Sequence, residues 1–321
     1  MDINQKLTEE LQVKQWQIDA AVKLIDEGNT IPFISRYRKE VTGALNDEQL
    51  RNLFERLTYL RNLEEKKEQV IGSIKEQGKL TDELKRQILE AETLVVVEDL
   101  YRPYRPKRRT RATIAKEKGL EPLAALIMLQ NTKVPLEEAA KAYLSEEKEV
   151  KTQADAIHGA MDILAEYISD EADYRIYIRD LTMKQGKLIS TAKNPEETSV
   201  YEMYYEFEEP VSRLAGHRIL ALNRGEKEKV LTVKIEAPEE KILQYLEKKV
   251  ISSSNPYTTP VLKEVIEDSY KRLIGPAIER EIRNELTEKA EDGAISVFGK
   301  NLQQLLMQPP IVGQVVLGWD P

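Results

Sequence analysis

The sequence predicts a mainly α-helical fold, a multi-helix array that carries one small β-hairpin. Along most of the chain, apolar residues recur at intervals of three and four, which is the period of an amphipathic helix. Glycine, proline and asparagine separate these segments after short distances, as in arrays of helices joined by short turns. The convincing strands are two neighbouring runs within 217–236, and Gly225 lies in the turn expected between them.

Composition limits the kinds of protein that this chain can be. Its 321 residues exceed a comfortable single helical domain, so two domains are expected. The absence of cysteine excludes disulfides and cysteine-ligated metal sites, and it fits the cytoplasm. No apolar run approaches the roughly 20 residues that cross a membrane, and the first residues do not resemble a signal peptide. We therefore expect a cytoplasmic protein without membrane association.

The first 45 residues predict two kinds of helical segment. Apolar spacing predicts one or two amphipathic helices that end at Gly28. Pro32 suits the first turn of a further short helix, and Gly43 is expected to stop it. The side chains of this short helix that are expected to face inward are Phe33, Ile34 and Tyr37. Its polar side carries three cations, Arg36, Arg38 and Lys39.

The longest predicted helix follows. Asn46 is its expected N-cap, and a helix that runs to about Gln77 would be roughly 45 Å long at 1.5 Å per residue. Leucines repeat along one face, at Leu50, Leu53, Leu57, Leu60 and Leu63. This stripe fits either a core within the chain or a seam with a partner. Two regular heptads favour the core, because coiled coils usually sustain three or four. Thr81 caps the next helix, which begins with acidic residues.

A strongly basic stretch interrupts this acidic chain, whose formal net charge is −8. Between Tyr101 and Lys118, eight basic residues face Glu117 alone, a formal charge of +7. Pro103 and Pro106 restrict the backbone, so the Tyr-Arg-Pro-Tyr-Arg-Pro run is expected to be extended and stiff, with its guanidinium groups held forward.

Two interpretations of the basic stretch stay open. It is either a solvated connector whose arginines pair with nearby acids, or a surface that contacts phosphates in a sequence-tolerant way, with tyrosine suited to stacked bases. The second interpretation gives the candidate nucleic-acid-binding residues of the stretch, Arg102, Tyr104, Arg105, Lys107, Arg108, Arg109 and Arg111. Arg36, Arg38 and Lys39 join them only if the fold brings them near.

The next part of the chain continues the helical array. Helices are expected to start near Pro122 and Pro135 and to cover 153–168 and 171–187. Residues 196–209 contain six glutamates and no basic residue, interleaved with aromatic side chains, which indicates a packed corner. Arg213 and Arg218 are expected to pair with Glu208 or Glu209 rather than with phosphate.

The last third predicts helices divided by sharp breaks. A helix capped by Thr259 is expected to break at Gly275-Pro276, and the next helix to end at Asp292-Gly293. The final residues, VVLGWDP, read as a β-strand.

Several stretches resemble one family, the Tex-type bacterial transcription accessory proteins. They are IPFISRYRKEVTGAL, EDLYRPYRPKRRTRATIAKEKGLEPLA, HRILALNRGE, YKRLIGPAIEREIRNELTEKAE and NLQQLLMQPPIVGQVVLGWDP. The resemblance implies an N-terminal helical domain over 1–195 with a helix-turn-helix-like part, and a second helical region over 196–310 that holds the hairpin. Residues 311–321 would start an RNase H-like domain. Helix-hairpin-helix and OB-fold domains would follow, and the chain looks cut before them.

Catalysis is not expected of this chain. It has no GxxxxGK phosphate loop, no HExxH and no cysteine nucleophile. Of the two histidines, His158 reads as a packing or capping residue, and His217 is expected to precede a strand. Asp320 resembles one carboxylate of an RNase H site, but paired metals need several converging acids. We expect no catalytic residue, no bound metal, no cofactor and no small-molecule substrate.

The resemblance and the basic stretch together predict the function. We expect a non-catalytic helical module of a transcription accessory protein that scaffolds binding of RNA or DNA, with RNA polymerase as a further possible partner. The alternative is a protein-interaction scaffold that docks onto RNA polymerase or onto the C-terminal domains of the family and does not itself bind nucleic acid.

Overall fold

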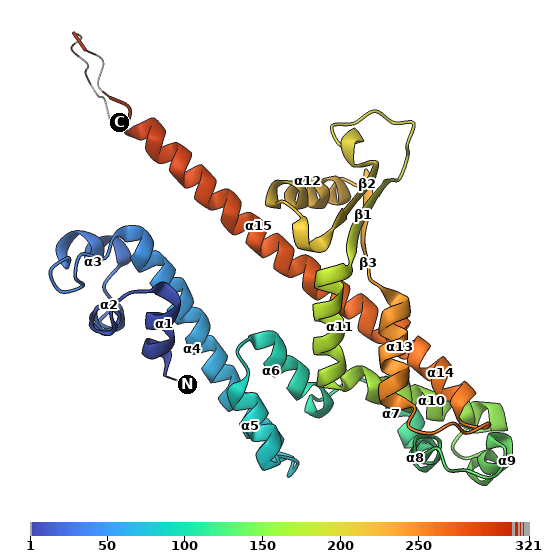
Figure 1. Ribbon diagram of the computed structural model, residues 1–321. Helices are drawn as coiled ribbons and strands as arrows, with labels where there is room; N and C mark the ends of the chain where they lie inside the picture. The colour runs from blue at the N-terminus through green and yellow to red at the C-terminus, as the bar shows by residue number, and fades with distance from the viewer. Residues whose placement is uncertain (1, 310–311, 314, 316, 318–321) are drawn as a thin grey trace. The chain divides into compact units, whose positions relative to one another are not determined.

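The structure, a computed structural model, describes residues 2–309, 312, 313, 315 and 317. Its mainly α fold confirms the predicted fold class (Figure 1). The chain forms two compact units: unit 1 is Met1–Arg108 with Asp170–Ala172, and unit 2 is Arg109–Ser169 with Asp173–Pro321. The expected domain boundary near residue 195 stays a prediction. The expected start of a further domain, 311–321, lies largely outside the described residues, as does the final strand.

Unit 1 is a helical body built around the long helix α4. Its elements are α1 (Ile3–Leu11), α2 (Gln15–Asp26), α3 (Ile31–Tyr37), α4 (Asp47–Glu76), α5 (Asp82–Glu90), α6 (Leu94–Tyr101) and the 3₁₀ turn η1 (Arg102–Tyr104). The predicted caps are confirmed. The Asn46 side chain accepts a hydrogen bond from the Gln49 amide at 2.8 Å, and Thr81 accepts one from the Leu84 amide at 3.2 Å.

The leucine stripe of α4 is the core of unit 1. Leu50, Leu53, Leu57, Leu60 and Leu63 are all nearly inaccessible to solvent and pack with side chains from the other helices of this unit. This confirms the interpretation of the stripe as core rather than as a seam.

The short helix α3 corrects one prediction. Ile34 is fully buried, but the Tyr37 side chain is 64% exposed. Phe33 and Tyr37 lie four residues apart and place their ring centroids 5.3 Å from each other. A helix of seven residues buries only one narrow face, and here that face belongs to Ile34.

Unit 2 combines further helices with a small sheet. Its elements are α7 (Arg111–Glu117), α8 (Glu121–Leu129), α9 (Leu136–Ala140), η2 (Lys141–Tyr143), α10 (Gln153–Asp170), α11 (Ala172–Gln185), β1 (Lys187–Ala192), η3 (Glu202–Tyr204), β2 (Glu206–Pro210), η4 (Val211–Arg213), α12 (Gly216–Lys227), β3 (Leu231–Glu236), α13 (Glu239–Val250), α14 (Thr259–Asp268), the π-helical segment η5 (Ser269–Ile274) and α15 (Gly275–Leu306). The α10–α11 junction, Asp170–Ala172, groups with unit 1.

The predicted β-hairpin over 217–236 is wrong. Its first half is helix α12, in which Ile219 and Leu222 are buried three residues apart, as the helical period requires. Its second half is β3, which pairs with β1 in an antiparallel sheet of order β2-β1-β3. The sequence analysis missed β1, of which only Lys187 lay within an expected helix, and β2, which lies in the segment interpreted as an acidic corner.

The helix breaks predicted at Gly275-Pro276 and at Asp292-Gly293 are also wrong. A proline inside an α-helix lacks an N–H and clashes with the carbonyl four residues earlier. Here η5 widens the turn before Pro276, and the Gly275 amide donates to the Tyr270 carbonyl, five residues back. Pro276 then lies in the first turn of α15, which runs on through Gly293 at a cost of about 1 kcal/mol.

Helix α15 covers the outer edge of the sheet. Glu279 accepts the Ile235 amide at 2.8 Å, and Arg283 donates to the Val233 carbonyl at 3.1 Å. Arg283 also donates to Glu226 of α12 at 2.5 and 3.1 Å. An uncovered edge strand would offer its backbone to other chains, so these side chains both hold β3 and block that pairing.

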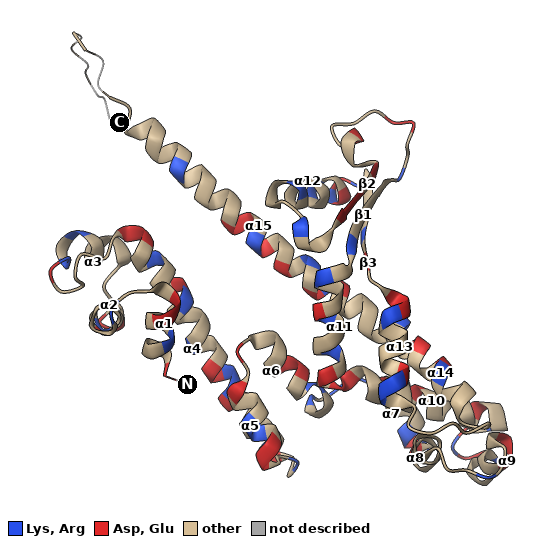
Figure 2. Ribbon diagram, in the orientation of Figure 1, with Lys and Arg blue, Asp and Glu red and all other residues tan. Residues whose placement is uncertain are grey.

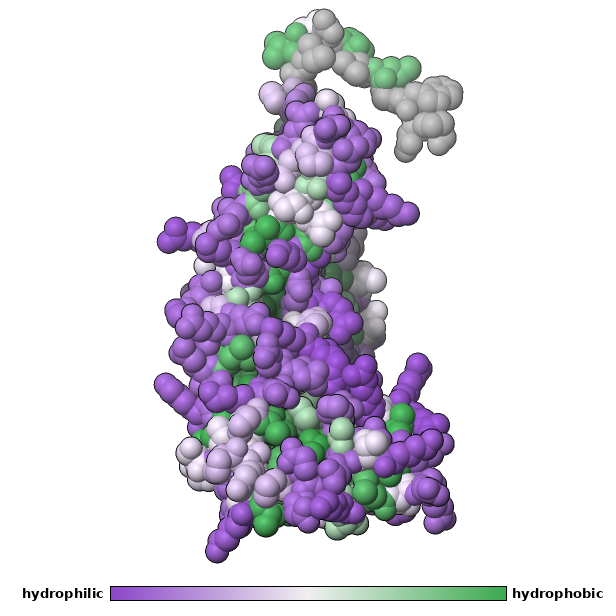
Figure 3. Space-filling model, turned by 90° about the vertical axis from the view of Figure 1, so that its right-hand side faces the viewer, coloured by the Kyte–Doolittle hydropathy of each residue, from purple (hydrophilic) through white to green (hydrophobic). Residues whose placement is uncertain are grey.

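The surface is largely hydrophilic where Figure 3 shows it, with hydrophobic side chains visible only as small patches. Among the described residues, no helix has the length and apolar character that crossing a membrane requires.

Replacing Arg283 with methionine is expected to lower the stability of unit 2 by roughly 1–3 kcal/mol, because Glu226 and the Val233 carbonyl lose their charged donor. Thermal unfolding at pH 7 measures the change as a drop of several degrees in melting temperature. Hydrogen bonding to Arg283 lowers the pKa of Glu226 from its ordinary value of 4.5. This stabilisation is therefore present above that value and is lost as the pH falls through the folded-state pKa, so the two proteins should converge in acid.

Lys289→Met is the matched control, because Lys289 pairs with Glu285 on the exposed side of the same helix. Such a surface pair contributes about 0.5 kcal/mol or less. Equal losses of stability in the two variants would show that Arg283 does not hold the sheet edge.

Candidate nucleic-acid interface

The basic stretch is less extended than the sequence predicts. Helix α6 runs directly into the 3₁₀ turn Arg102–Tyr104, because the fixed φ of Pro103 also suits the first turn of a helix. The backbone becomes extended at Arg105 and stays open until Thr110 caps α7. Thr110 accepts a hydrogen bond from the Thr113 amide at 3.1 Å, and the Thr113 hydroxyl accepts one from the Thr110 amide at 2.7 Å.

Within unit 1, the 3₁₀ turn is tied to the C-terminal end of α4. The Tyr101 hydroxyl lies 3.0 Å from the Ser73 hydroxyl, and Gln77 donates to the Tyr104 carbonyl at 2.9 Å. Tyr104 is half-buried in the core of unit 1, so its ring serves packing as well as any contact with a ligand.

Asp170 engages two of the predicted cations. Its carboxylate lies 3.3 Å from Arg102 and also accepts a hydrogen bond from Lys107. The Asp170 side chain is only 13% exposed. A carboxylate held so far from water stabilises the charges beside it, so Arg102 and Lys107 anchor the stretch to this short segment of unit 1.

The remaining arginines of the stretch face solvent. Arg105 lies 3.9 Å from Glu98, and Arg109 lies 3.6 Å from Glu117 with its side chain 74% exposed. Exposed pairs of this kind contribute about 0–1 kcal/mol and exchange readily for another anion. Arg108 and Arg111 are exposed, and among the described residues they have no carboxylate within 4 Å. The boundary between the units falls between Arg108 and Arg109.

The structure does not bring Arg36, Arg38 and Lys39 to the basic stretch. Helix α3 lies beside the start of α4, whereas α6 lies near the other end of that helix (Figure 1). The 30 residues of α4 span about 45 Å. All three side chains are exposed, and they form a separate basic group within unit 1.

Charges of both signs alternate along most helices of the chain (Figure 2). Many of these charges form ion pairs. Arg218, for example, pairs with Glu209 at 2.6 Å, as the sequence predicts. Arg213 is exposed, and His217 lies on α12 rather than before a strand.

Asp320 lies outside the described residues. Within the described ranges, no three acidic or histidine side chains gather as a metal site would require. Nothing tests the expectation that this chain is not an enzyme.

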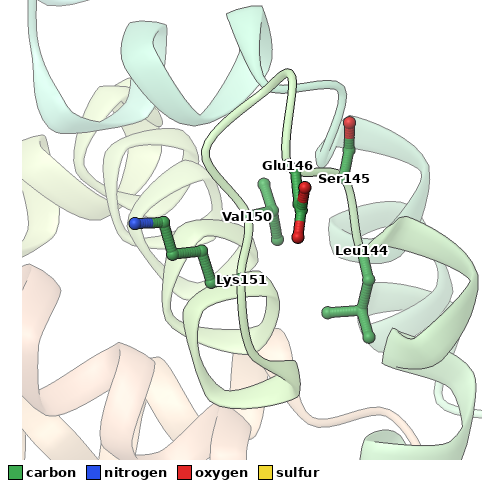
Figure 4. A pocket seen from close by; sticks show the side chains of 5 residues that line it. All are labelled: Leu144, Ser145, Glu146, Val150 and Lys151. Carbon is green, nitrogen blue, oxygen red and sulfur yellow. The ribbon is translucent and has the colours of Figure 1, made fainter.

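A surface pocket of unit 2 adds no further chemistry. It is lined by Leu144, Ser145, Glu146, Val150 and Lys151. Ser145 and Val150 close the turn with two backbone hydrogen bonds, of 3.0 and 2.8 Å. Figure 4 shows Lys151 and Leu144 pointing to different sides, so these side chains do not converge on a common point.

Two features of the site were missed by sequence reasoning. Asp170 lies 63 residues from Lys107, and no local pattern connects them. Tyr37 is expected from the sequence to face inward, but its ring is exposed, and so is the ring of Trp16. For Tyr37, its place between Arg36 and Arg38 in the sequence was the available signal, because aromatic and basic residues together are typical of nucleic-acid surfaces.

Two family models match the chain. The Tex-like protein N-terminal domain matches residues 1–75, and the Tex central region-like model matches residues 130–298, which is more than half of the chain. Uncharacterized protein YdcI of Bacillus subtilis is 51% identical over 99% of this chain, and Transcriptional accessory protein Tex of Neisseria gonorrhoeae is 39% identical over 100%. S1 RNA-binding domain-containing protein 1 of Homo sapiens is 32% identical over 100%. The chain spans 45%, 43% and 33% of these relatives, respectively.

Asp170→Ala is expected to lower the stability of unit 1 by roughly 1–3 kcal/mol, because Arg102 and Lys107 lose a carboxylate in a poorly hydrated place. Glu117→Ala is the control, since it removes the exposed partner of Arg109 and should change stability by about 0.5 kcal/mol or less. Thermal unfolding followed by circular dichroism measures both. An unchanged melting temperature in the Asp170 variant would contradict the anchoring role.

Proposed function

The chain belongs to the Tex-like protein family, and on that premise we propose that it is a non-catalytic, nucleic-acid-associated module of a transcription accessory protein that scaffolds RNA or DNA binding. The names of two relatives, one a transcriptional accessory protein and one an S1 RNA-binding domain-containing protein, support this role. The structural observation that carries the proposal is the set of exposed arginines between α6 and α7, namely Arg105, Arg108, Arg109 and Arg111.

Their chemistry fits phosphate. A guanidinium donates two parallel hydrogen bonds to phosphate oxygens and stays charged at any physiological pH. Arg105 and Arg111 are six residues apart, so an extended chain separates them by at most about 21 Å. The net charge of −8 opposes polyanions elsewhere, and the stretch therefore acts only within about 8 Å at physiological salt. Phosphate contacts of this kind orient a nucleic-acid strand but do not distinguish its base sequence.

Asp170 makes the stretch suitable for this role. Because Arg102 and Lys107 are held by that carboxylate, the extended backbone after Tyr104 leaves from a fixed place in unit 1. The neighbouring arginines then need less ordering on binding, which favours affinity. The helix-turn-helix-like part, the sequence tolerance and a cytoplasmic location belong to the same proposal.

The second candidate function is protein interaction, with RNA polymerase or the remaining family domains as the partner. One observation favours it. The last part of α15 exposes apolar side chains at three- and four-residue spacing, at Ile295, Phe298, Leu302 and Leu305, which are between 42% and 69% exposed. A helix face of this kind is typical of a surface that another protein covers.

Charge reversal separates the two candidates. The triple variant Arg105→Glu, Arg108→Glu, Arg109→Glu is expected to abolish binding of a labelled RNA or duplex DNA at about 50 mM salt, as measured by fluorescence anisotropy. The wild-type affinity should fall as salt rises, with a log-log slope near −0.7 to −0.9 per phosphate contacted. The melting temperature should stay nearly unchanged, because these side chains are exposed.

A triple variant with the same change in net charge provides the control. Lys133, Lys227 and Lys248 are exposed, and among the described residues they have no carboxylate within 4 Å, so their change to glutamate should weaken binding only slightly. Absence of binding by the wild-type chain at low salt would exclude the first function and leave protein interaction. A large drop in the melting temperature of the first variant would show that these arginines stabilise the fold instead of contacting a ligand.

A further inference from the structure

A second surface of unit 1 combines exposed rings with unpaired cations. It consists of Tyr37 at the end of α3 and the basic residues Arg36, Arg38 and Lys39, together with Trp16 of α2, whose ring lies against Gly43 in the turn that follows α3, and we call it the α3 surface. Within unit 1, α3 lies near the start of α4, whereas α6, which leads into the basic stretch, lies near its other end (Figure 1).

The turn after α3 is rigid. Thr42 is fully buried, and its hydroxyl donates to the Arg38 carbonyl at 3.2 Å. Gln17 of α2 donates to the carbonyls of Thr42 and Gly43 at 3.2 and 3.1 Å. Gly43 has a φ of +64°, and a Cβ there would lie 2.3 Å from the Trp16 ring. Glycine is therefore required at position 43 for two reasons, the positive φ and the close approach of the Trp16 ring. These contacts hold the turn against α2.

The rings of the α3 surface are available for stacking. The Tyr37 side chain is 64% exposed and the Trp16 side chain 50%. Tyr37 is supported from behind by Phe33, at 5.3 Å between centroids, and the Arg38 guanidinium lies 5.0 Å from the centre of the Phe33 ring. A supported ring loses little freedom when a base stacks on it, and each stacked base contributes about 1–3 kcal/mol in known complexes.

The cations of the α3 surface are open as well. Arg36, Arg38 and Lys39 are exposed, and within the described part of the chain they have no carboxylate within 4 Å. Arg38 donates only to the neighbouring Tyr37 carbonyl, at 3.1 Å. Glu40 is the single acid in the segment between Ile31 and Leu45. Three neighbouring cations and one acid give this segment a local positive charge in a chain of net charge −8.

We propose that the α3 surface binds single-stranded nucleic acid, with Tyr37 and Trp16 stacking on unpaired bases and Arg36, Arg38 and Lys39 contacting the adjacent phosphates. A duplex hides its base faces, so the exposed rings favour a single strand. The inference rests on the proposed association with nucleic acid, but it uses none of the residues of the basic stretch, because α3 and α6 lie near opposite ends of α4, a helix about 45 Å long.

The test compares ring and charge variants of the full chain. Tyr37→Ala should weaken binding of a fluorescein-labelled 20-nucleotide oligo(U) about fivefold or more, and Tyr37→Phe, which keeps the ring, by less than about twofold. Binding of a 20-base-pair duplex should not change with Tyr37→Ala. Arg36→Glu, Arg38→Glu, Lys39→Glu should weaken all ligands and reduce the salt dependence. Oligo(dT) of the same length distinguishes DNA from RNA.

Tyr167→Ala removes a ring of α10 that is 58% exposed and serves as the matched control, expected to leave oligo(U) affinity unchanged. Circular dichroism verifies that each variant is folded. If Tyr37→Ala and Tyr37→Phe weaken binding equally, or if neither the ring nor the charge variant weakens it, the α3 surface is not a single-strand site; an acidic protein would then be its remaining partner.

Failure of this inference is distinguishable from failure of the proposed site. Loss of binding in the Arg105, Arg108, Arg109 variant alone supports the basic stretch and overturns the α3 surface. Loss of binding in the α3-surface variants alone supports the α3 surface and overturns the basic stretch. Absence of binding by the wild-type chain to every oligonucleotide overturns both.

Discussion

The burial of Arg175 is the constraint on which unit 2 depends. This guanidinium on α11 is fully buried and donates to Glu281 of α15 at 2.6 Å, and Arg179 donates to the same carboxylate at 2.6 Å. A buried charge without a partner costs several kcal/mol, so α15 has to lie where Glu281 meets both arginines. Glu279 and Arg283, on either side of Glu281, then reach the outer edge of β3. One ion cluster thereby fixes the helix, and the helix fixes the sheet.

The same rule sorts the cations of the basic stretch. Where a carboxylate is shielded from water, as Asp170 is, the cations beside it are part of the architecture. Where the partner is exposed and distant, as Glu98 is for Arg105, the cation remains available to another anion. The seven residues predicted in this stretch therefore do not form a uniform site. The two cations next to Asp170 hold the backbone, and the exposed arginines are the ones with which phosphate contact is physically compatible.

Local signals explain what the sequence could predict. Asn46 and the leucines specify α4, and Thr81 specifies the start of α5, by chemistry that acts within a few residues, so both helices could be predicted with their N-caps. The errors arose where distant residues decide. Helix α15 passes Pro276 because η5 lies before it and Glu281 holds it. The exposure of Tyr37 depends on which side of α3 faces α4, and Arg102 and Lys107 depend on an acid more than 60 residues away.

The α3 surface and the part of the basic stretch that belongs to unit 1 can differ in ligand within one acidic chain, because they lie near opposite ends of α4. The length of α4, about 45 Å, is several times the screening length of about 8 Å at physiological salt. Neither surface therefore changes the electrostatic potential at the other. The binding properties of each surface depend on the residues that surround it. At the basic stretch these neighbours are carboxylates and a half-buried tyrosine, which leaves charge as the means of recognition. At the α3 surface they are exposed rings on a locked turn, which adds base stacking to the same charge.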